Sequence, residues 1–99
     1  MKNDEEKAIS FLEDAKDALV RYRLKLKEGN VKDALFWIDV AWMMLHAGAW
    51  FLRDRQFLFD QIGDICNDIR CMKRKTPSDF RTMVKVMRND IDVIIESLK

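Results

Sequence analysis

The chain has 99 residues, of which 48% are hydrophobic and 35% are charged, and its formal net charge at pH 7 is +1. This length predicts a single domain over residues 1–99, and the composition excludes intrinsic disorder. The small net charge excludes bulk electrostatic attraction to nucleic acid or to a membrane surface. Any such attraction must come from how the charges are arranged.

The N-terminal stretch MKNDEEKA is acidic and polar, which is not the pattern of a signal peptide. The two cysteines, Cys66 and Cys71, point about 140° apart on one predicted helix, so we expect no intrahelical disulfide. Without nearby histidines they form no zinc site. We interpret both as reduced core or boundary residues, and we predict a cytoplasmic protein with no cofactor or metal.

The first predicted helix runs from Asn3 or Asp4 to Glu28. Its acidic start and basic end complement the helix dipole. Gly29 ends it, because glycine adopts the left-handed conformation after a helix without strain. Apolar residues recur at alternating steps of four and three, which is typical of a helix packed lengthwise on others: Ala8, Leu12, Ala15, Leu19, Tyr22 and Leu26.

The second predicted helix contains the stretch around which the chain is organised, residues 34–52, ALFWIDVAWMMLHAGAWFL. Asn30 caps this helix, and Asp33 is placed to return a hydrogen bond to the cap. The loop before it is so short that the first two helices should form an antiparallel hairpin. Gly48 weakens the helix, which ends either near that residue or at Leu52.

Apolar side chains occur on every side of this helix, where only Asp39 and His46 are ionisable. A helix of this kind must be enclosed by protein or by lipid. A membrane span needs about 20 apolar residues, and the stretch reaches that length only by including Asp39, which is costly in lipid. Amphipathic helices elsewhere in the chain offer a protein cover, so we predict no membrane partner.

The polar residues 53–56 predict the next boundary, with Asp54 as a possible N-cap of a third helix that runs to about Lys75. Thr76 as a cap and Pro77 in the first helical position predict the start of a fourth helix, which continues to the C-terminus. Both helices carry a heptad stripe: Leu58, Ile62, Ile65, Ile69 and Met72 in the third, and Phe80, Val84, Met87, Ile91, Ile94 and Leu98 in the fourth.

Four helices with short loops and no strand-like alternation predict an all-α protein, an antiparallel up-down four-helix bundle in which helix 2 is central and apolar. In a monomer of this kind helix 2 would expose apolar side chains, and contiguous apolar surface of that size marks a partner site. We therefore predict a homodimer, and the alternative is that the other helices enclose helix 2 within one chain. The predicted interface residues are Phe36, Trp37, Met43, Met44 and Trp50.

Candidate catalytic and metal-binding groups are few. Asp39 and His46 share one face of helix 2 but lie about 10 Å apart along its axis, so they cannot bond each other, and we interpret them as structural. Neither cysteine has an evident base beside it, so we predict no nucleophilic site. A row of aspartates would suit magnesium, but the Glu-x-x-Glu pairs of helical nucleotide pyrophosphohydrolases are absent, and we interpret the row as a solvated face: Asp60, Asp64 and Asp68.

In an up-down bundle, helices 1 and 3 end at the pole where helices 2 and 4 begin, so basic residues gather there beside two helix N-termini. This pole is a candidate site for phosphate or nucleic acid, although basic residues at helix ends also complement the dipole. No Gly-rich loop or reading helix supports base recognition. The candidate anion-binding residues are Arg23, Lys27, Lys32, Arg70, Arg74, Lys75 and Arg81.

A family pattern is carried by Ala8, Phe11-Leu12, Ala15, Ala18-Leu19, Glu28-Gly29-Asn30, Ala34-Leu35-Phe36 and Ala41. This hairpin resembles that of HEPN-type helical bundles and, through Asp33-Ala34 and Leu45-His46-Ala47-Gly48, small uncharacterised archaeal helical proteins. HEPN ribonucleases carry an arginine several residues before a histidine, whereas no arginine precedes His46 in that range. The resemblance thus implies a bundle that dimerises, lacks the nuclease site and serves a binding or partner role for a nucleotide-handling protein.

These observations favour a non-enzymatic helical interaction module that homodimerises through helix 2. The alternative is phosphate or nucleic-acid binding at the basic pole. A second alternative is a magnesium-dependent helical enzyme that processes nucleotides.

Overall fold

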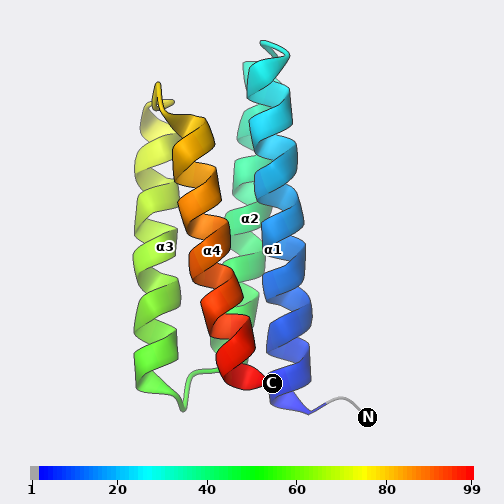
Figure 1. Ribbon diagram of the computed structural model, residues 1–99, viewed down its shortest axis with the longest axis vertical. Coiled ribbons are helices and arrows are strands. Elements are labelled where there is room, and N and C mark those ends of the chain that lie inside the picture. The colour runs from blue at the N-terminus through cyan, green and yellow to red at the C-terminus, as the bar shows by residue number, and fades with distance from the viewer. Residues whose placement is uncertain (1–2) are drawn as a thin grey trace.

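The computed structural model describes residues 3–99 and contains four helices: α1 (Asp4–Lys27), α2 (Val31–Phe51), α3 (Gln56–Arg74) and α4 (Phe80–Leu98). Consecutive helices run in opposite directions, as Figure 1 shows, and the packed pairs are α1 with α2, α2 with α3, α3 with α4, and α4 with α1. The chain is therefore an all-α, up-down four-helix bundle, which confirms the predicted fold class.

The core is built from the heptad stripes that the sequence predicts. A stripe residue returns to the same side of the helix after every two turns, so each stripe forms one continuous inward face. All but two of the predicted stripe residues are buried, and the exceptions, Leu26 and Phe80, lie half-buried at the ends of their helices. α2 contributes its own inward face of Ala34, Ile38, Ala41, Leu45 and Gly48.

The interface between α1 and α2 is lined by small residues at intervals of seven. Ala8 and Ala15 on α1 and Ala41 and Gly48 on α2 are all buried, and short side chains let two helix backbones approach closely. A Cβ built on Gly48 would lie 3.4 Å from Leu12 Cδ2, which is ordinary van der Waals contact. α2 continues through Gly48 and ends at Phe51, which decides between the two ends that the sequence left open.

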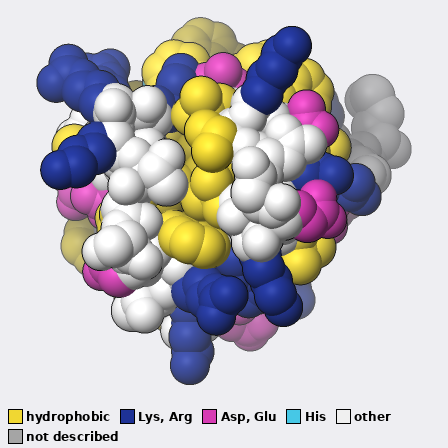
Figure 2. Space-filling view, turned by 90° about the horizontal axis from the view of Figure 1, so that it is seen from above, with side chains coloured by type: hydrophobic (Ala, Val, Ile, Leu, Met, Phe, Trp, Pro, Cys, Tyr) yellow, Lys and Arg dark blue, Asp and Glu magenta, His cyan; other side chains and the backbone are white. Residues whose placement is uncertain are grey.

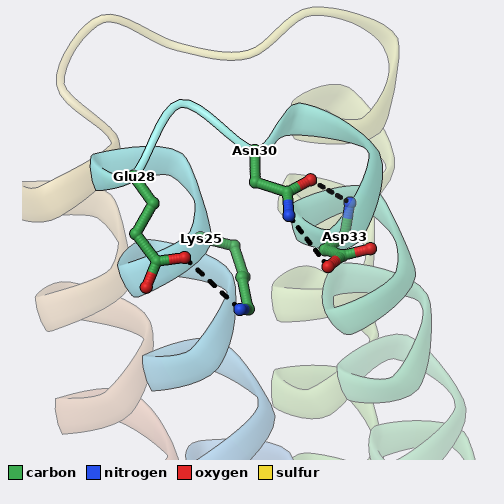
Figure 3. A network of polar contacts seen from close by, with 4 residues as sticks. All are labelled: Lys25, Glu28, Asn30 and Asp33. Carbon is green, nitrogen blue, oxygen red and sulfur yellow. Dashed lines mark hydrogen bonds and ion pairs between the residues drawn. The ribbon is translucent and has the colours of Figure 1, made fainter.

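The turn between α1 and α2 forms as the sequence predicts. Gly29 adopts φ +81°, its N–H donates to Leu26 O at 3.0 Å, and the N–H of Asn30 donates to Lys25 O at 2.9 Å. This pair of bonds closes α1 as a Schellman motif. The Asn30 side chain accepts a hydrogen bond from the Asp33 N–H at 3.1 Å, which caps α2. The same side chain donates to the Asp33 carboxylate at 2.9 Å, so Asp33 returns a bond to the cap (Figure 3).

Two predicted helix starts are wrong in detail. α3 begins after Arg55, and the side chain of Asp54 makes no cap bond. α4 begins at Phe80 rather than at Pro77, because residues 76–79 form a loop and turn, and the first helical bond runs from Met83 N–H to Asp79 O at 3.1 Å. Thr76 is therefore no helix cap. Proline at a first helical position is compatible with a helix start but does not require one.

By length and composition α2 is the one helix in the described part of the chain that meets the criteria for a membrane-spanning segment. The core helix of a water-soluble bundle meets the same criteria. Within one chain α2 packs on α1 and α3, and its remaining side faces outward.

Candidate functional site

The outward side of α2 carries a second apolar stripe, opposite the one that enters the core. We call it the outer stripe. Phe36, Met43 and Trp50 are 59%, 56% and 61% exposed, and the half-buried Val40 and Ala47 lie between them. The five residues alternate in steps of four and three, which is the spacing by which one helix packs along another. α2 therefore has a complete packing face that no other helix of its own chain covers.

The other two predicted interface residues, Trp37 and Met44, lie half-buried on the side of α2 that faces α1. The Arg21 guanidinium of α1 stands 4.8 Å from the centre of the Trp37 ring. One heptad beyond Met44, Phe51 stacks on Phe11 of α1 with ring centres 5.8 Å apart. These contacts are made within the chain. The apolar surface of α2 that stays uncovered is therefore the outer stripe and not the side that faces α1.

A groove runs beside the outer stripe, between α2 and α3, and encloses about 400 Å³. We call it the α2–α3 groove. Its walls are mostly aromatic and aliphatic, and a few polar side chains converge at one end. Such a combination is typical of small-molecule sites. The residues that line it are Trp42, His46, Ala49, Trp50, Phe59, Ile62, Gly63, Cys66, Asn67 and Arg70.

His46 and Cys66 meet in this groove, with His46 Nδ1 3.4 Å from Cys66 Sγ and 3.2 Å from Trp42 O. The prediction that neither cysteine has a histidine or other base beside it is wrong for Cys66. The antiparallel register of α2 and α3 brings together two residues that are 20 positions apart. Cys71, which we expected in or near the core, is exposed.

The geometry of this pair does not make Cys66 a nucleophile. Burial raises the pKa of the Cys66 thiol to about 11, and the nearby Arg70 charge only partly offsets that effect. The thiol is therefore neutral at physiological pH, and a thiolate is required for nucleophilic attack. His46 and Cys66 are two potential metal ligands, and within residues 3–99 no group of three or more His, Cys, Asp or Glu side chains is placed to hold a metal ion.

Asp39 does not share a site with His46. Its carboxylate pairs with the Lys73 ammonium of α3, and this ammonium lies 6.0 Å from the centre of the Trp42 ring. This ion pair links α2 to α3 beside the α2–α3 groove. This pairing agrees with the structural role expected for Asp39, and its partner on α3 depends on how α3 is rotated about its axis.

The predicted anion-binding residues lie at one end of the bundle but divide into separate groups. Arg23, Lys27 and Arg81 line one groove of about 270 Å³ between α1 and α4, and none of them pairs with a carboxylate in the described chain. Arg70 belongs to the α2–α3 groove. Figure 2 looks onto this end and shows Lys and Arg side chains distributed around the rim of a largely uncharged centre. The remaining candidates, Lys32, Arg74 and Lys75, line neither groove.

The aspartate row of α3 divides in a similar way. Asp64 and Asp68 line a groove between α3 and α4 together with Asp90, and this groove encloses about 230 Å³. Asp60 accepts a hydrogen bond from the Gln56 side chain at 2.8 Å. The sequence did not indicate Asp90, because its position beside α3 depends on how α4 is rotated.

Comparison of the chain with family models, with curated proteins and with solved structures found no match. The resemblance of residues 8–52 to HEPN-type hairpins therefore stays a prediction from the sequence.

Proposed function

We propose that this protein is a non-enzymatic helical interaction module, and that it forms a homodimer through the outer stripe of α2. The proposal is supported above all by the exposure of Phe36, Met43 and Trp50 along one heptad-spaced line. Aromatic residues and methionine are enriched at protein interfaces and depleted from surfaces that stay in water. Covering this line with a second helix removes apolar area from water, which favours association.

A second copy of the chain matches the outer stripe when the two α2 helices run antiparallel about a two-fold axis near Met43. Phe36 and Trp50 lie seven residues on either side of Met43, so each faces the other across the axis. The same register brings the first turn of one α2, which carries Lys32 and Asp33, beside the turn that follows Phe51 of the other, which carries Arg53 and Asp54. In this arrangement Lys32 lies near Asp54 of the second copy, whereas a parallel pairing would bring each charge near its own copy.

The solution mass tests the proposal. The wild-type protein is expected to sediment as a species of twice the 11.8 kDa chain mass. Met43→Glu places two carboxylates against each other at the axis and should weaken the dimer by at least about tenfold. The matched control is Val93→Glu, which changes an equally exposed apolar residue on α4. A wild-type monomer at high concentration, or equal effects of both substitutions, would contradict the proposal.

A charge exchange tests the antiparallel register separately. Lys32→Glu alone should weaken the dimer, because it meets Asp54 across the axis, and Asp54→Lys alone should do the same. The double variant restores opposite charges and should recover the affinity in a double-mutant cycle. If the two effects simply add, the helices do not pair in this register, even where the first experiment finds a dimer on the outer stripe.

A second candidate function is phosphate or nucleic-acid binding, and it is favoured by the groove between α1 and α4, whose three cations, Arg23, Lys27 and Arg81, form no ion pair with a described carboxylate. These three positive charges come from two helices, and none of them has a carboxylate partner among the described residues. Phosphate oxygens can therefore bind them without an ion pair having to break first. Titration with a random single-stranded oligonucleotide at low salt tests this. Lys27→Glu and Arg81→Glu should each reduce binding, whereas Arg74→Glu, outside the groove, should reduce it less. No binding at low salt would exclude this function.

A further inference from the structure

The α2–α3 groove has two chemically different ends, because its two helices run antiparallel. At one end Trp50 of α2 lies with the apolar Phe59 and Ile62 of α3, and the Arg53 guanidinium stands 4.4 Å from the centre of the Trp50 ring. At the other end the lining residues of α3 become polar, with Asn67 followed by Arg70. A molecule that fills the groove therefore meets aromatic and aliphatic surface at one end and hydrogen-bond donors at the other.

The α3 side of the groove is open in its middle, where Gly63 lies between Phe59 and Asn67. A Cβ built on Gly63 meets no atom within 4 Å, so neither helix fills this space with a side chain. The enclosed volume of about 400 Å³ falls in the range of roughly 300–1,000 Å³ that is usual for small-molecule sites. The groove is thus large enough for a small organic molecule.

The polar end of the groove carries an uncompensated positive charge. Arg70 forms no ion pair with any described carboxylate, and none of the residues that line the groove is Asp or Glu. The one acid nearby on α2, Asp39, is already paired with Lys73. A planar guanidinium with a side-chain amide beside it matches a carboxylate, which it can hold through two parallel N–H···O bonds.

From these features we infer that the α2–α3 groove binds a small aromatic carboxylate, with its ring between Trp50 and Phe59 and its carboxylate at Arg70. Three aromatic side chains in the lining favour a flat apolar body, because offset or edge-to-face ring contacts add to the burial of area. Arg70 is the one Lys or Arg among the residues that line the groove, and its single charge favours a carboxylate over a dianionic phosphate. Trp50 belongs both to the groove and to the outer stripe, whereas Arg70 and Gly63 belong to α3 and lie outside the outer stripe, so variants of these two residues test the groove separately from the dimer.

The test is a titration with 2-naphthoate and with its neutral analogue 2-naphthylmethanol, followed by the indole N–H signals in NMR spectra. The signals of Trp42 and Trp50 should shift, and that of Trp37, which lies on the α1 side, should not. 2-Naphthoate should bind roughly tenfold more tightly than the alcohol, because only the acid pairs with Arg70. Equal affinities, or equal shifts of all three indole signals, would overturn the inference.

Two pairs of variants locate the site. Arg70→Gln should remove the preference for the acid over the alcohol, whereas Arg74→Gln, outside the groove, should keep it. Gly63→Leu should abolish binding of both probes, because the leucine side chain fills the groove. Gly63→Ala adds only a methyl group and should retain most of the binding affinity. Leucine and alanine both favour a helix over glycine, and the space around Gly63 is open, so these variants should fold. Unchanged binding by Gly63→Leu would place the probe elsewhere.

Discussion

Tyr22 is the largest side chain that lies wholly inside the bundle, and its hydroxyl has no hydrogen-bond partner among the residues that the structure describes. A buried hydroxyl without a partner has lost its bonds to water and gained none in return. Burial also raises the pKa of this phenol, so the group stays neutral throughout the physiological range.

Tyr22→Phe should therefore leave the free energy of unfolding unchanged or raise it by about 1 kcal/mol, because it removes an unsatisfied polar group and keeps the ring. Urea unfolding of the two proteins measures the difference. A loss of more than about 1 kcal/mol would mean that the hydroxyl has a partner in solution.

The Cys66 thiol gives the stability of the bundle a pH dependence of known sign. The pKa of the thiol is 9.0 in the unfolded chain, and burial raises this pKa to about 11 in the folded chain. The folded state binds this proton more tightly, so the contribution is complete below pH 9 and is lost as the pH rises toward 11. The expected loss from this thiol is about 1 kcal/mol near pH 10.

The Cys66→Ala variant isolates this effect, because it keeps every other titrating group. Urea unfolding at about pH 8 and about pH 10 should show a smaller fall in stability for the variant than for the wild type. The absolute stability of the variant does not enter the comparison. Equal falls would mean that the thiol ionises alike in both states.

At the scale of elements, Gly29 and Gly63 are a matched pair that differ only in backbone conformation. A Cβ meets no atom within 4 Å at either residue, but Gly29 has φ +81° and Gly63 lies inside α3. Gly29→Ala should lower the free energy of unfolding by about 1 kcal/mol, because L-residues disfavour the left-handed region. Gly63→Ala should raise it by about 0.5–1 kcal/mol through helix propensity.

Thermal or urea unfolding of the two single variants checks this contrast. Because both sites are spacious, loss of packing cannot account for opposite signs. Effects of the same sign would show that one of the two backbones differs from the structure.

Most of the element boundaries could be predicted from local sequence. The Asn30 cap and the Gly29 turn are confirmed, because each depends on the chemistry of neighbouring residues. The expected start of α4 at Pro77 is wrong, since a proline permits a helix start without requiring one. The sequence leaves the end of α2 undecided between Gly48 and Leu52, because a single glycine weakens a helix by about 1 kcal/mol. In the structure the packing of Gly48 against α1 offsets this cost.

At the scale of the whole molecule, α2 separates into an inner and an outer face. At concentrations where the protein is monomeric, Ile38→Ala should cost about 2–5 kcal/mol, because Ile38 is fully buried. Met43→Ala should cost less than about 0.5 kcal/mol there, because that side chain is exposed in the single chain. Unfolding measured at low protein concentration compares the two variants, and equal losses would show that Met43 is already covered within one chain.

Concentration then separates folding from association. If the outer stripe is the dimer interface, the midpoint temperature of the wild type should rise with protein concentration, and that of Met43→Ala should rise less. A midpoint that is independent of concentration for both proteins would leave the outer stripe without a partner copy.

The sequence by itself determined the four helices, their inward stripes and the all-α bundle, because hydrophobic periodicity and capping are set by residues a few positions apart. Only the tertiary structure decided which side of α2 stays uncovered, that His46 meets Cys66, and that Arg23, Lys27 and Arg81 share one groove. These features depend on the rotation of each helix about its axis and on the register between helices. Both are fixed by packing between residues far apart in the chain, which no local pattern specifies.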